Sequence, residues 1–420
     1  MRARALLSSL LLPAATFTLA AQAPGKTPAC GSDHAGLKLP PGFCAVLVAE
    51  SLAVPRHLAV APNGDVFFAA RGTRSAGGGG VYLLRDTTGD GKADIVSKFF
   101  DGPGGSGIAL APDAVYFAAD ERVLRFPWSP GALMPTGPAD TIAKGLPVGG
   151  HAAKGIALGP DNALFVSFGS QTNSCLPQGI DRSQTRQPGP NPCTELETRA
   201  GIWRFDARKQ NQTPADGKRW ATGLRNAMAV TIQPGTGSLY AGVHGRDGLA
   251  SQWGYSDEES AENPAEVVHA LPEGTDAGWP YCYVDSRKKV RVLNPEYGGD
   301  GTKVGDCEQK AMPAVVFPGH WAPNGIAFYS GTQFPAPYHG GLFVAFHGSW
   351  NRAPLPQQGF RVAFAPFRNG AAVGSYETFM TPAAGETAIR PTGLAVGPDG
   401  SLYIGSDAQG KIWRVMYKGN

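Results

Sequence analysis

Short apolar stretches separated by tight turns recur along this chain. In the segment 150–169, apolar residues at 156–158 are followed by the turn sequence Gly-Pro-Asp-Asn at 159–162 and by apolar and aromatic residues at 164–168. Proline presets a turn angle and asparagine tolerates the left-handed conformation, whereas β-branched and aromatic residues favour strands. The segment therefore predicts a β-hairpin.

The same hairpin pattern recurs six times. The copies are residues 58–70, 107–118, 156–168, 229–242, 325–345 and 393–406. Pro62, Pro112 and Pro160 mark the first three turns, and repeats of roughly 40–50 residues are typical of β-propeller blades. The later gaps are wider and must hold inserted loops, which gather on one face of such folds. We therefore predict an all-β, six-bladed β-propeller with inserted loops on one face.

The N-terminus resembles a secretory signal peptide over residues 1–23. Arg2 and Arg4 precede an apolar run at 6–20, and Ala-Gln-Ala at 21–23 fits a cleavage site. The run is short and interrupted by serine and proline, which disfavours a membrane anchor. We expect a periplasmic or secreted protein without stable membrane insertion. An N-terminal extension at 24–38 then leads into the propeller domain at 39–420.

The amino-acid composition argues against nucleic acid as a partner. The chain contains 57 glycines and 36 prolines, in keeping with many turns, and its net charge is only +3 with 17% charged residues. A nucleic-acid-binding protein usually carries a clear basic excess. We therefore expect no nucleic-acid partner.

The cysteine count fits an exported protein. The six cysteines are Cys30, Cys44, Cys175, Cys193, Cys282 and Cys307. An even number in such a protein implies disulfides, and six cysteines allow fifteen pairings. Proximity in sequence suggests that each cysteine pairs with its nearest neighbour, although spacing alone leaves crossed pairings open. The chain contains no CxxCH motif, so we expect no covalently attached c-type haem.

The segment from Asp86 to Asp94 allows two interpretations. Acidic residues at 86, 90 and 94 surround Gly-Asp-Gly and could supply oxygen ligands to calcium. The segment lacks the third-position acid and the closing glutamate of an EF-hand, so a tight turn between outer strands is the alternative. Trp279, in a Gly-Trp-Pro corner, similarly fits either core packing or substrate stacking.

Several polar residues stand a few positions ahead of the first strand of a repeat. They are Arg56, His57, His151, Lys154, Arg225, Asn226, His320, Trp321, Asn324 and Arg390. Equivalent positions of a propeller converge on one axis. A cluster of cations with a histidine there would suit a polyanionic ligand, because charge-assisted hydrogen bonds are strong.

These residues resemble the soluble quinoprotein glucose/sorbosone dehydrogenases, nearest to the L-sorbosone dehydrogenase-like branch. The resemblance runs from about Leu39 to Val415. It is carried by the His151 segment before Gly-Pro-Asp, by Gly-Leu-Arg-Asn at 223–226, by 266–280, by Ala-Pro-Asn-Gly at 322–325, by His-Gly-Ser-Trp-Asn-Arg at 347–352 and by Arg390 before Gly-Pro-Asp-Gly. Family members are six-bladed propellers that bind pyrroloquinoline quinone (PQQ) and oxidise aldoses.

The resemblance implies a role for each matching residue. His151 matches the general base that takes the proton of the substrate hydroxyl. Arg225, Asn226 and Arg390 match cofactor-binding residues. The main-chain carbonyls of Gly245 and Arg246 match ligands of the calcium ion that sits on the cofactor. Arg352 and Lys154 compete for the cation of the fifth blade.

Four positions depart from the glucose enzymes. Gly104-Gly105-Ser106 stands where an amide side chain often meets the cofactor, and Arg246 replaces a proline. His320, a further cofactor-binding candidate, stands near a hydroxyl residue of those enzymes, and Thr392 replaces their last arginine. These changes favour the sorbosone-like branch and leave the substrate open.

The resemblance therefore predicts an exported PQQ- and calcium-dependent dehydrogenase of an aldose or related sugar or aldehyde. Its electrons would pass to an external acceptor, a cytochrome or a quinone. Two alternatives remain. One is a non-catalytic propeller that binds a protein or glycan, since a fold alone does not specify function. The other is a metal-dependent lactonase, which needs acidic and amide side chains where this sequence places mostly His and Arg.

Overall fold

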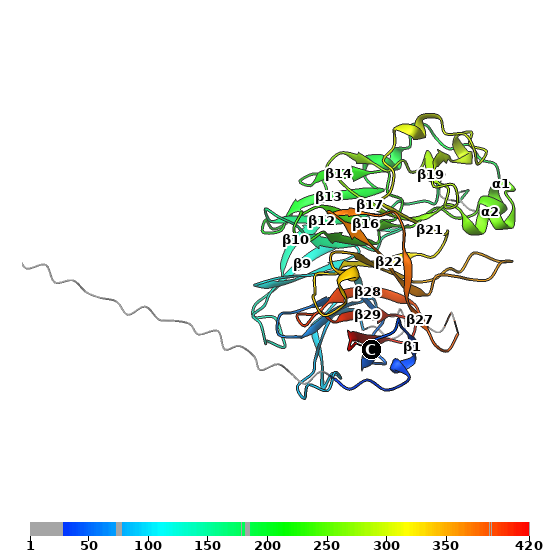
Figure 1. The fold of residues 1–420 in the computed structure, drawn as a ribbon. Helices are drawn as coiled ribbons and strands as arrows, with labels where there is room; N and C mark the ends of the chain where they lie inside the picture. Colours follow the sequence, from blue (N-terminus) through cyan, green and yellow to red (C-terminus); the bar gives the residue numbers. More distant parts are fainter. Residues whose placement is uncertain are drawn as a thin grey trace, which may run out of the picture.

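The computed structural model describes residues 28–72, 78–177, 179–180, 185–385, 387 and 389–419. The predicted signal peptide lies outside the described residues. Strands of the described chain form six main sheets arranged as blades, which confirms the predicted six-bladed β-propeller (Figure 1). Each predicted repeat supplies the first two strands of one blade.

The first three blades follow one another along the chain, each with its innermost strand first. The first blade contains β3 (Pro55–Val60), β4 (Val66–Ala70), β5 (Gly80–Arg85) and β6 (Ile95–Asp101). The second contains β7 (Gly105–Ala111), β8 (Ala114–Ala119), β9 (Arg122–Pro127) and β10 (Asp140–Lys144). The third contains β11 (Ile156–Leu158), β12 (Ala163–Phe168), β13 (Gly201–Asp206) and β14 (Lys218–Thr222), with the short β18 (Thr275–Asp276) added in parallel.

The last three blades are formed by the second half of the chain, and the fifth and sixth also include a strand from its beginning. The fourth contains β15 (Ala229–Ile232), β16 (Leu239–Val243), β17 (Glu266–Ala270) and β21 (Val315–Phe317). The fifth contains β22 (Pro323–Phe328), β23 (Leu342–Phe346), β24 (Arg361–Ala365) and β27 (Glu377–Pro382), extended by β1 (Leu37–Lys38). The sixth contains β28 (Pro391–Val396), β29 (Leu402–Ser406), β30 (Lys411–Tyr417) and, from the start of the chain, β2 (Phe43–Ala49).

Glycines at the start of four inner strands let neighbouring blades approach closely. A Cβ on Gly325 would lie 2.4 Å from the carbonyl oxygen of Thr392, and one on Gly393 would lie 2.3 Å from that of Arg56. Gly107 and Gly155 meet the next blade in the same way, at 2.7 and 2.5 Å from a carbonyl oxygen. Distances this short exclude any side chain, so the repeated glycine sets how tightly the inner strands close around the axis.

The hydrophobic core is divided among the gaps between blades. Six buried clusters each draw side chains from two adjacent blades, the sixth and first blades included. All five residues of β4 and all six of β8 are buried, because a sheet packed on both sides has no solvent face. The ring therefore closes through apolar contacts as well as through β2.

The inserted segments gather beside the blades. Figure 1 shows α1 (Leu249–Trp253), α2 (Asp257–Glu262) and β19 (Cys282–Val284) together at the right of the view. β19 pairs with β20 (Arg291–Leu293), and the amide of Ala265 donates to Val284. These segments form a cap over the fourth blade, in keeping with the predicted clustering of insertions. We call residues 244–265 and 275–311 the cap.

The three disulfides join nearest neighbours in sequence. Cys30 pairs with Cys44, Cys175 with Cys193, and Cys282 with Cys307. The predicted pairing is confirmed.

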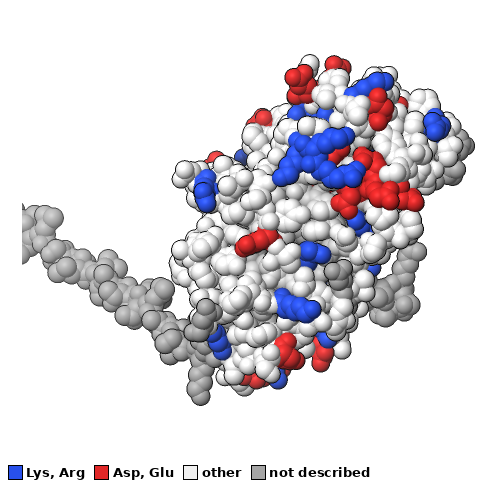
Figure 2. Space-filling model, turned by 45° about the vertical axis from the view of Figure 1, so that its right-hand side comes forward, with Lys and Arg blue, Asp and Glu red and all other residues white. Residues whose placement is uncertain are grey.

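Among the described residues, no helix has the length and apolar character needed to cross a membrane. On the face seen in Figure 2, the largest group of basic side chains adjoins a group of acidic ones.

We expect Gly325→Ala to lower the free energy of unfolding by about 1–3 kcal/mol, because its methyl group would overlap the Thr392 carbonyl. Gly137→Ala is the matched control, since its nearest neighbour, a Pro127 side-chain atom, lies 3.8 Å from the added Cβ. Denaturant unfolding followed by tryptophan fluorescence measures both variants. Equal stability of the two would contradict the close approach.

Candidate functional site

A cavity of about 220 Å³ opens where loops of the third, fourth and fifth blades meet. Its lining consists of His151, Arg225, Asn226, His244, Gly245, Asp247, Glu266, His320, Ala322, Trp350 and Asn351. Five of the residues predicted from the sequence are thus brought together: His151, Arg225, Asn226, Gly245 and His320. Their shared position ahead of an inner strand, or directly after a second strand for Gly245, explains the convergence.

His151 precedes β11 and is oriented by Ser170, just after β12. The His151 Nδ1 atom lies 3.0 Å from both the carbonyl oxygen and the hydroxyl oxygen of Ser170. A carbonyl oxygen only accepts, so Nδ1 carries the proton and Nε2 keeps its lone pair. Burial, together with the positive charge of Arg225, lowers the pKa of His151 to about 3. The cavity wall therefore holds a neutral imidazole with an acceptor nitrogen at pH 7.

Arg225 precedes β15, and its side chain is only 5% exposed. Nη1 donates to the carbonyl oxygen of Gly245 at 2.7 Å, and Nη2 donates to Asp247 Oδ2 at 3.1 Å. Asn173 accepts two further hydrogen bonds from the same guanidinium group. The charge of this predicted cofactor-binding arginine is thus already balanced by a carboxylate of the protein.

Glu266 begins β17 and faces the same cavity with little exposure. Its Oε2 accepts a hydrogen bond of 3.3 Å from the Gly245 amide. Burial raises the pKa of Glu266 to about 8, although His320 and Arg225 act in the opposite direction. The cavity therefore contains a carboxyl group that is largely protonated at pH 7, near the Asp247 side chain that pairs with Arg225.

His244 and Asn226 form the wall between the fourth and fifth blades. His244 Nε2 donates to the carbonyl oxygen of Pro323 at 3.2 Å, which leaves Nδ1 to accept from the Asn226 amide at 3.5 Å. Burial and the charge of Arg225 lower the pKa of His244 to about 3. Because the Asn226 NH₂ group faces His244, its carbonyl oxygen is left as an acceptor.

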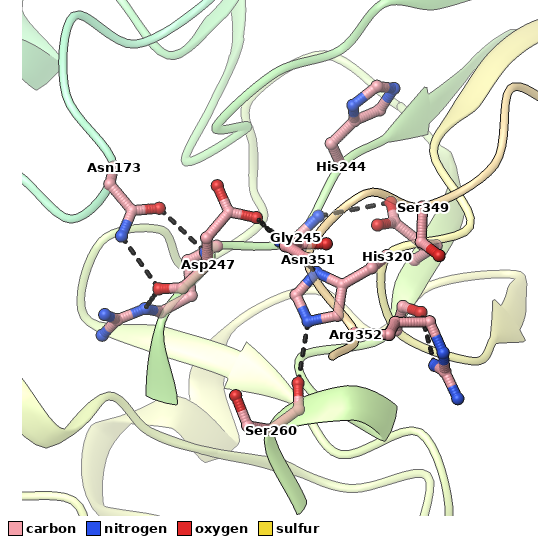
Figure 3. Close-up of polar contacts among 12 residues, drawn as sticks. Asn173, His244, Gly245, Asp247, Ser260, His320, Ser349, Asn351 and Arg352 are labelled. Atoms are coloured by element: carbon pink, nitrogen blue, oxygen red, sulfur yellow. Dashed lines mark hydrogen bonds and ion pairs between the residues drawn. The ribbon is translucent and has the colours of Figure 1, made fainter. Parts of the chain in front are cut away.

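His320, Asn351 and Asp247 form a polar chain across the cavity (Figure 3). Asn351 Nδ2 donates to Asp247 Oδ1 at 2.6 Å and lies 3.2 Å from His320 Nδ1, while His320 Nε2 lies 2.8 Å from the carbonyl oxygen of Ser260. Burial opposes protonation of His320, but Asp247 and Glu266 outweigh it, so the pKa of His320 is raised. Asn351 Oδ1 is buried and has no hydrogen-bond partner in the described chain.

Three predicted cofactor-binding residues, Lys154, Arg352 and Arg390, lie outside the lining of this cavity. Lys154 is buried, and its Nζ donates to the carbonyl oxygens of Ala152 and Pro147, the latter at 2.8 Å. Arg352 is also buried, with Nη2 donating to Glu262 Oε1 at 2.6 Å and Nη1 to the carbonyl oxygens of Ala261 and Gly319. Arg352 therefore anchors the end of α2.

The Arg246 side chain does not line this cavity and bonds to other residues of the cap. Its Nη1 is paired with both carboxylate oxygens of Glu296, and Nη2 donates to Gln252 at 2.7 Å. Arg246 and Glu296 are almost fully buried. The side chain thus serves the cap, and only the main chain of Arg246 remains as a ligand candidate.

Arg390 belongs to a second polar group, on the sixth blade. Its Nη1 lies 3.4 Å from His347 Nδ1, and its guanidinium carbon lies 5.0 Å from the ring centre of Phe360. His347 Nε2 lies 2.9 Å from Asp407, which also accepts from Arg56 at 2.6 Å. Arg390 is therefore held at the channel mouth, but outside the lining of the cavity around His151.

Six lining residues were not predicted as site residues. They are His244, Asp247, Glu266, Ala322, Trp350 and Asn351. Most of them follow the second strand of a blade, whereas the prediction considered mainly residues ahead of the first strand. The second strand of a blade ends where the first begins, so attention to the positions directly after the second strands, where Gly245 also lies, could have identified most of these neighbours.

Two ambiguous sequence features are resolved by their contacts. The loop from Asp86 to Asp94 connects β5 to β6, and both carboxylates accept hydrogen bonds from the loop's own amides. These contacts favour the tight-turn interpretation. Trp279 is 5% exposed and packs against the Cys175–Cys193 disulfide, which confirms core packing. Within the described residues, no group of three or more His, Cys, Asp or Glu side chains could hold a metal ion.

A comparison with models of protein families identifies the family of this chain. A family model described as TrAA12-like matches residues 37–418. The chain belongs to the TrAA12-like family. Since that match covers nearly the whole propeller, it confirms the predicted resemblance to soluble PQQ-dependent sugar dehydrogenases at the level of the family.

Two curated proteins share part of the sequence. A pyrroloquinoline quinone-dependent pyranose dehydrogenase of Coprinopsis cinerea is 25% identical over 297 residues, covering 60% of this chain and 38% of that protein. An uncharacterized protein of Borreliella burgdorferi is 27% identical over 205 residues, covering 47% of this chain and 48% of that protein. The chain thus aligns with less than half the length of either relative.

Solved structures share the fold. The PQQ domain of Coprinopsis cinerea pyranose dehydrogenase, in its holo form, superposes with a TM-score of 0.74 at 20% identity, covering 90% of this chain and 97% of the domain. A calcium structure of a Trichoderma reesei family AA12 enzyme has a TM-score of 0.75 at 18% identity, covering 91% and 97%. PQQ-bound aldose sugar dehydrogenase from Streptomyces coelicolor has a TM-score of 0.56 at 20% identity, covering 90% and 99%.

A smaller chamber of about 50 Å³ lies behind the wall formed by Arg225, His244 and Gly245. His269, on β17, lines it and is 2% exposed. Burial, together with the charge of Arg291, lowers the pKa of His269 to about 3. An unfolded histidine binds a proton below about pH 6.5, whereas His269 in the folded TrAA12-like protein stays neutral. Acidification therefore favours the unfolded chain.

We expect the wild-type protein to lose about 2 kcal/mol more stability between pH 7 and pH 5 than His269→Phe does. The unfolded wild-type chain takes up a proton in this window that the folded chain excludes, and phenylalanine removes this difference. Urea unfolding at pH 7, 6 and 5 measures the two slopes. Parallel loss of stability in both proteins would show that His269 is not buried in its neutral form.

Proposed function

We propose that this TrAA12-like protein is an exported, PQQ-dependent sugar dehydrogenase. The observation that carries the proposal is the geometry of His151, a neutral histidine whose Nδ1 is bonded to Ser170 and whose acceptor nitrogen remains for the cavity. A neutral imidazole can accept the proton of a sugar hydroxyl. Arg225 and Asn226 stand in the same cavity, where they would meet a polar ligand.

The residues present fit the chemistry of PQQ. Its three carboxylates call for cations, which Arg225 would supply beside its partner Asp247 and Arg390 would supply from the sixth blade. The Asn226 carbonyl oxygen would instead face a hydrogen-bond donor of the ligand.

PQQ also carries a pyrrole N–H group, which donates a hydrogen bond. The buried Asn351 Oδ1 atom has no donor in the described chain and would accept such a bond. Glu266, kept largely protonated by burial, adds little repulsion to an anionic ligand. When bound, PQQ supplies the ortho-quinone that accepts hydride from the substrate.

The protein's own contribution is to orient the substrate and move its proton. His151 Nε2 takes the hydroxyl proton as the carbon–hydrogen electron pair leaves the substrate. The Ser170 contacts then hold the imidazolium that forms, since Nδ1–H continues to donate to the carbonyl oxygen. The local charge of Asp247 favours this protonated state. The two electrons would pass on to an external acceptor, a cytochrome or a quinone.

Calcium is part of the proposal. The carbonyl oxygens of Gly245 and Arg246 would hold the ion. Calcium would act as a Lewis acid there.

The substrate class we propose is an aldose in its ring form. The names of the pyranose and aldose sugar dehydrogenases among the relatives and structural matches support it. A sorbosone-type aldehyde, which the sequence resemblance favoured, is the alternative within the same activity.

We expect the purified protein to bind PQQ more tightly with calcium than with EDTA, and to reduce an artificial acceptor when given an aldose. His151→Gln should lower kcat about 10²- to 10⁴-fold while PQQ still binds, because only the proton acceptor is lost. His339→Gln, at an exposed position after β22, is the control and should leave turnover unchanged. Stopped-flow absorbance of the quinone and steady-state assays with aldoses and sorbosone measure these effects. Full activity of His151→Gln would exclude His151 as the base.

Trp350 offers a second test at the rim of the cavity. Its side chain lines the cavity and is 70% exposed, an unusual position for so large an apolar group. We expect it to stack on the apolar face of a sugar ring. Trp350→Ala should raise KM about tenfold with kcat changed little, and Trp350→Phe should restore most of the affinity. An unchanged KM in Trp350→Ala would rule out the stacking role.

A further inference from the structure

Asn173 lies in the loop that follows β12, and only 1% of its surface is exposed. No feature of the sequence marked it as a site residue, and it does not line the cavity itself. Its side chain and carbonyl oxygen nevertheless bond to three segments that are distant in sequence: Arg225, Asp247 and Trp279. These contacts place it directly behind the charged wall of the cavity.

Two of these hydrogen bonds fix the guanidinium group of Arg225. Nε donates to the Asn173 carbonyl oxygen at 3.1 Å, and Nη2 donates to Asn173 Oδ1 at 3.0 Å. Because the acceptors meet different nitrogen atoms of a planar group, together they set both the position and the rotation of that plane.

The same amide holds the main chain of Asp247. Oδ1 accepts from the Asp247 amide at 2.9 Å, and Nδ2 donates to the Asp247 carbonyl oxygen at 2.9 Å (Figure 3). The Asp247 carboxylate can then bond to Arg225 on one side and to Asn351 on the other. One side chain therefore sets the geometry of both members of the buried ion pair.

Asn173 is itself held in place. Trp279 Nε1 donates to its carbonyl oxygen at 3.0 Å, and the Cys175–Cys193 disulfide begins two residues later. An amide suits this position because it offers a donor and an acceptor that do not titrate. A carboxylate would place a second negative charge beside Asp247, against the carbonyl oxygen that now accepts from Nδ2.

We propose that Asn173 is a positioning residue that aims the Arg225 guanidinium at the cavity and locks Asp247 as its counter-charge. Its effect on PQQ binding, which rests on the proposed function, is exerted through Arg225. Its effect on the orientation of Arg225 exists without any cofactor, so the two consequences can be measured separately.

The first measurement uses the apo protein and phenylglyoxal, which modifies accessible arginines. We expect Asn173→Ala to accelerate modification of Arg225 about tenfold, read by peptide mass mapping. The variant loses the Oδ1 acceptor of Arg225 Nη2 and both side-chain contacts that hold Asp247, while the main-chain carbonyl contact to Nε remains. Gln212→Ala is the matched control. Gln212 is a buried amide that bonds to Asp206 and Lys209 in the connection between the outer strands of the third blade. It should destabilise the fold without changing the reactivity of Arg225.

Asn173→Asp is a second variant that keeps the proposal testable if the alanine variant does not fold. It keeps an acceptor for Arg225 Nη2 but loses the donor to Asp247, so Arg225 should be modified more slowly than in Asn173→Ala. Equal Arg225 reactivity in wild type and Asn173→Ala would overturn the proposal. So would equal acceleration in Gln212→Ala, which would reveal general loosening of the fold.

The second measurement is a double-mutant cycle on PQQ affinity. Asn173→Ala should weaken PQQ binding about tenfold in the wild-type background and less than about twofold in the Arg225→Ala background. Equal weakening in both backgrounds would overturn the assignment of its effect to Arg225. Absence of PQQ binding by the wild type would sink the proposed function, and the phenylglyoxal rates would then decide the positioning role alone.

Discussion

The close approach of neighbouring inner strands is the constraint on which the rest of this structure depends. At four of the six junctions a glycine lies so near a carbonyl of the next blade that no side chain fits. This spacing brings the segments ahead of the inner strands to one mouth, and it brings the loops after the second strands there as well. Residues as far apart as His151 and Asn351 therefore share one cavity because of backbone geometry that is set elsewhere.

Closure of the ring has a second requirement. The outer strand of the sixth blade, β2, comes from the beginning of the chain and pairs with β30 near its end. The clusters of buried side chains between blades make each interface depend on its two neighbours. The same packing holds the cavity in place, because its lining residues lie within a few positions of the strands that they follow or precede.

Within the cavity, burial and charge pairing act in opposite directions on different groups. Burial keeps His151 and His244 neutral and Glu266 largely protonated, because none of them has a close counter-charge that outweighs the loss of water. Arg225 and Asp247 face each other as an ion pair, and Asn173 bonds to further polar groups of both residues. The site thus combines neutral imidazole acceptors with one fixed ion pair.

The sequence by itself determined the six-bladed architecture and pointed to five residues of the cavity, and it suggested the disulfide pairing without excluding crossed pairings. These predictions rest on local periodicity, on proximity in sequence, on a position shared between repeats and, for Gly245, on the family resemblance. The tertiary structure alone decided that Lys154 and Arg352 bond to carbonyls and to α2 instead of lining the cavity, and that Arg246 turns into the cap toward Glu296. It also brought Asp247, Glu266 and Asn173 to the site. The direction of a long side chain and the partner of a buried charge depend on segments far away in the chain, and a local pattern carries no information about them.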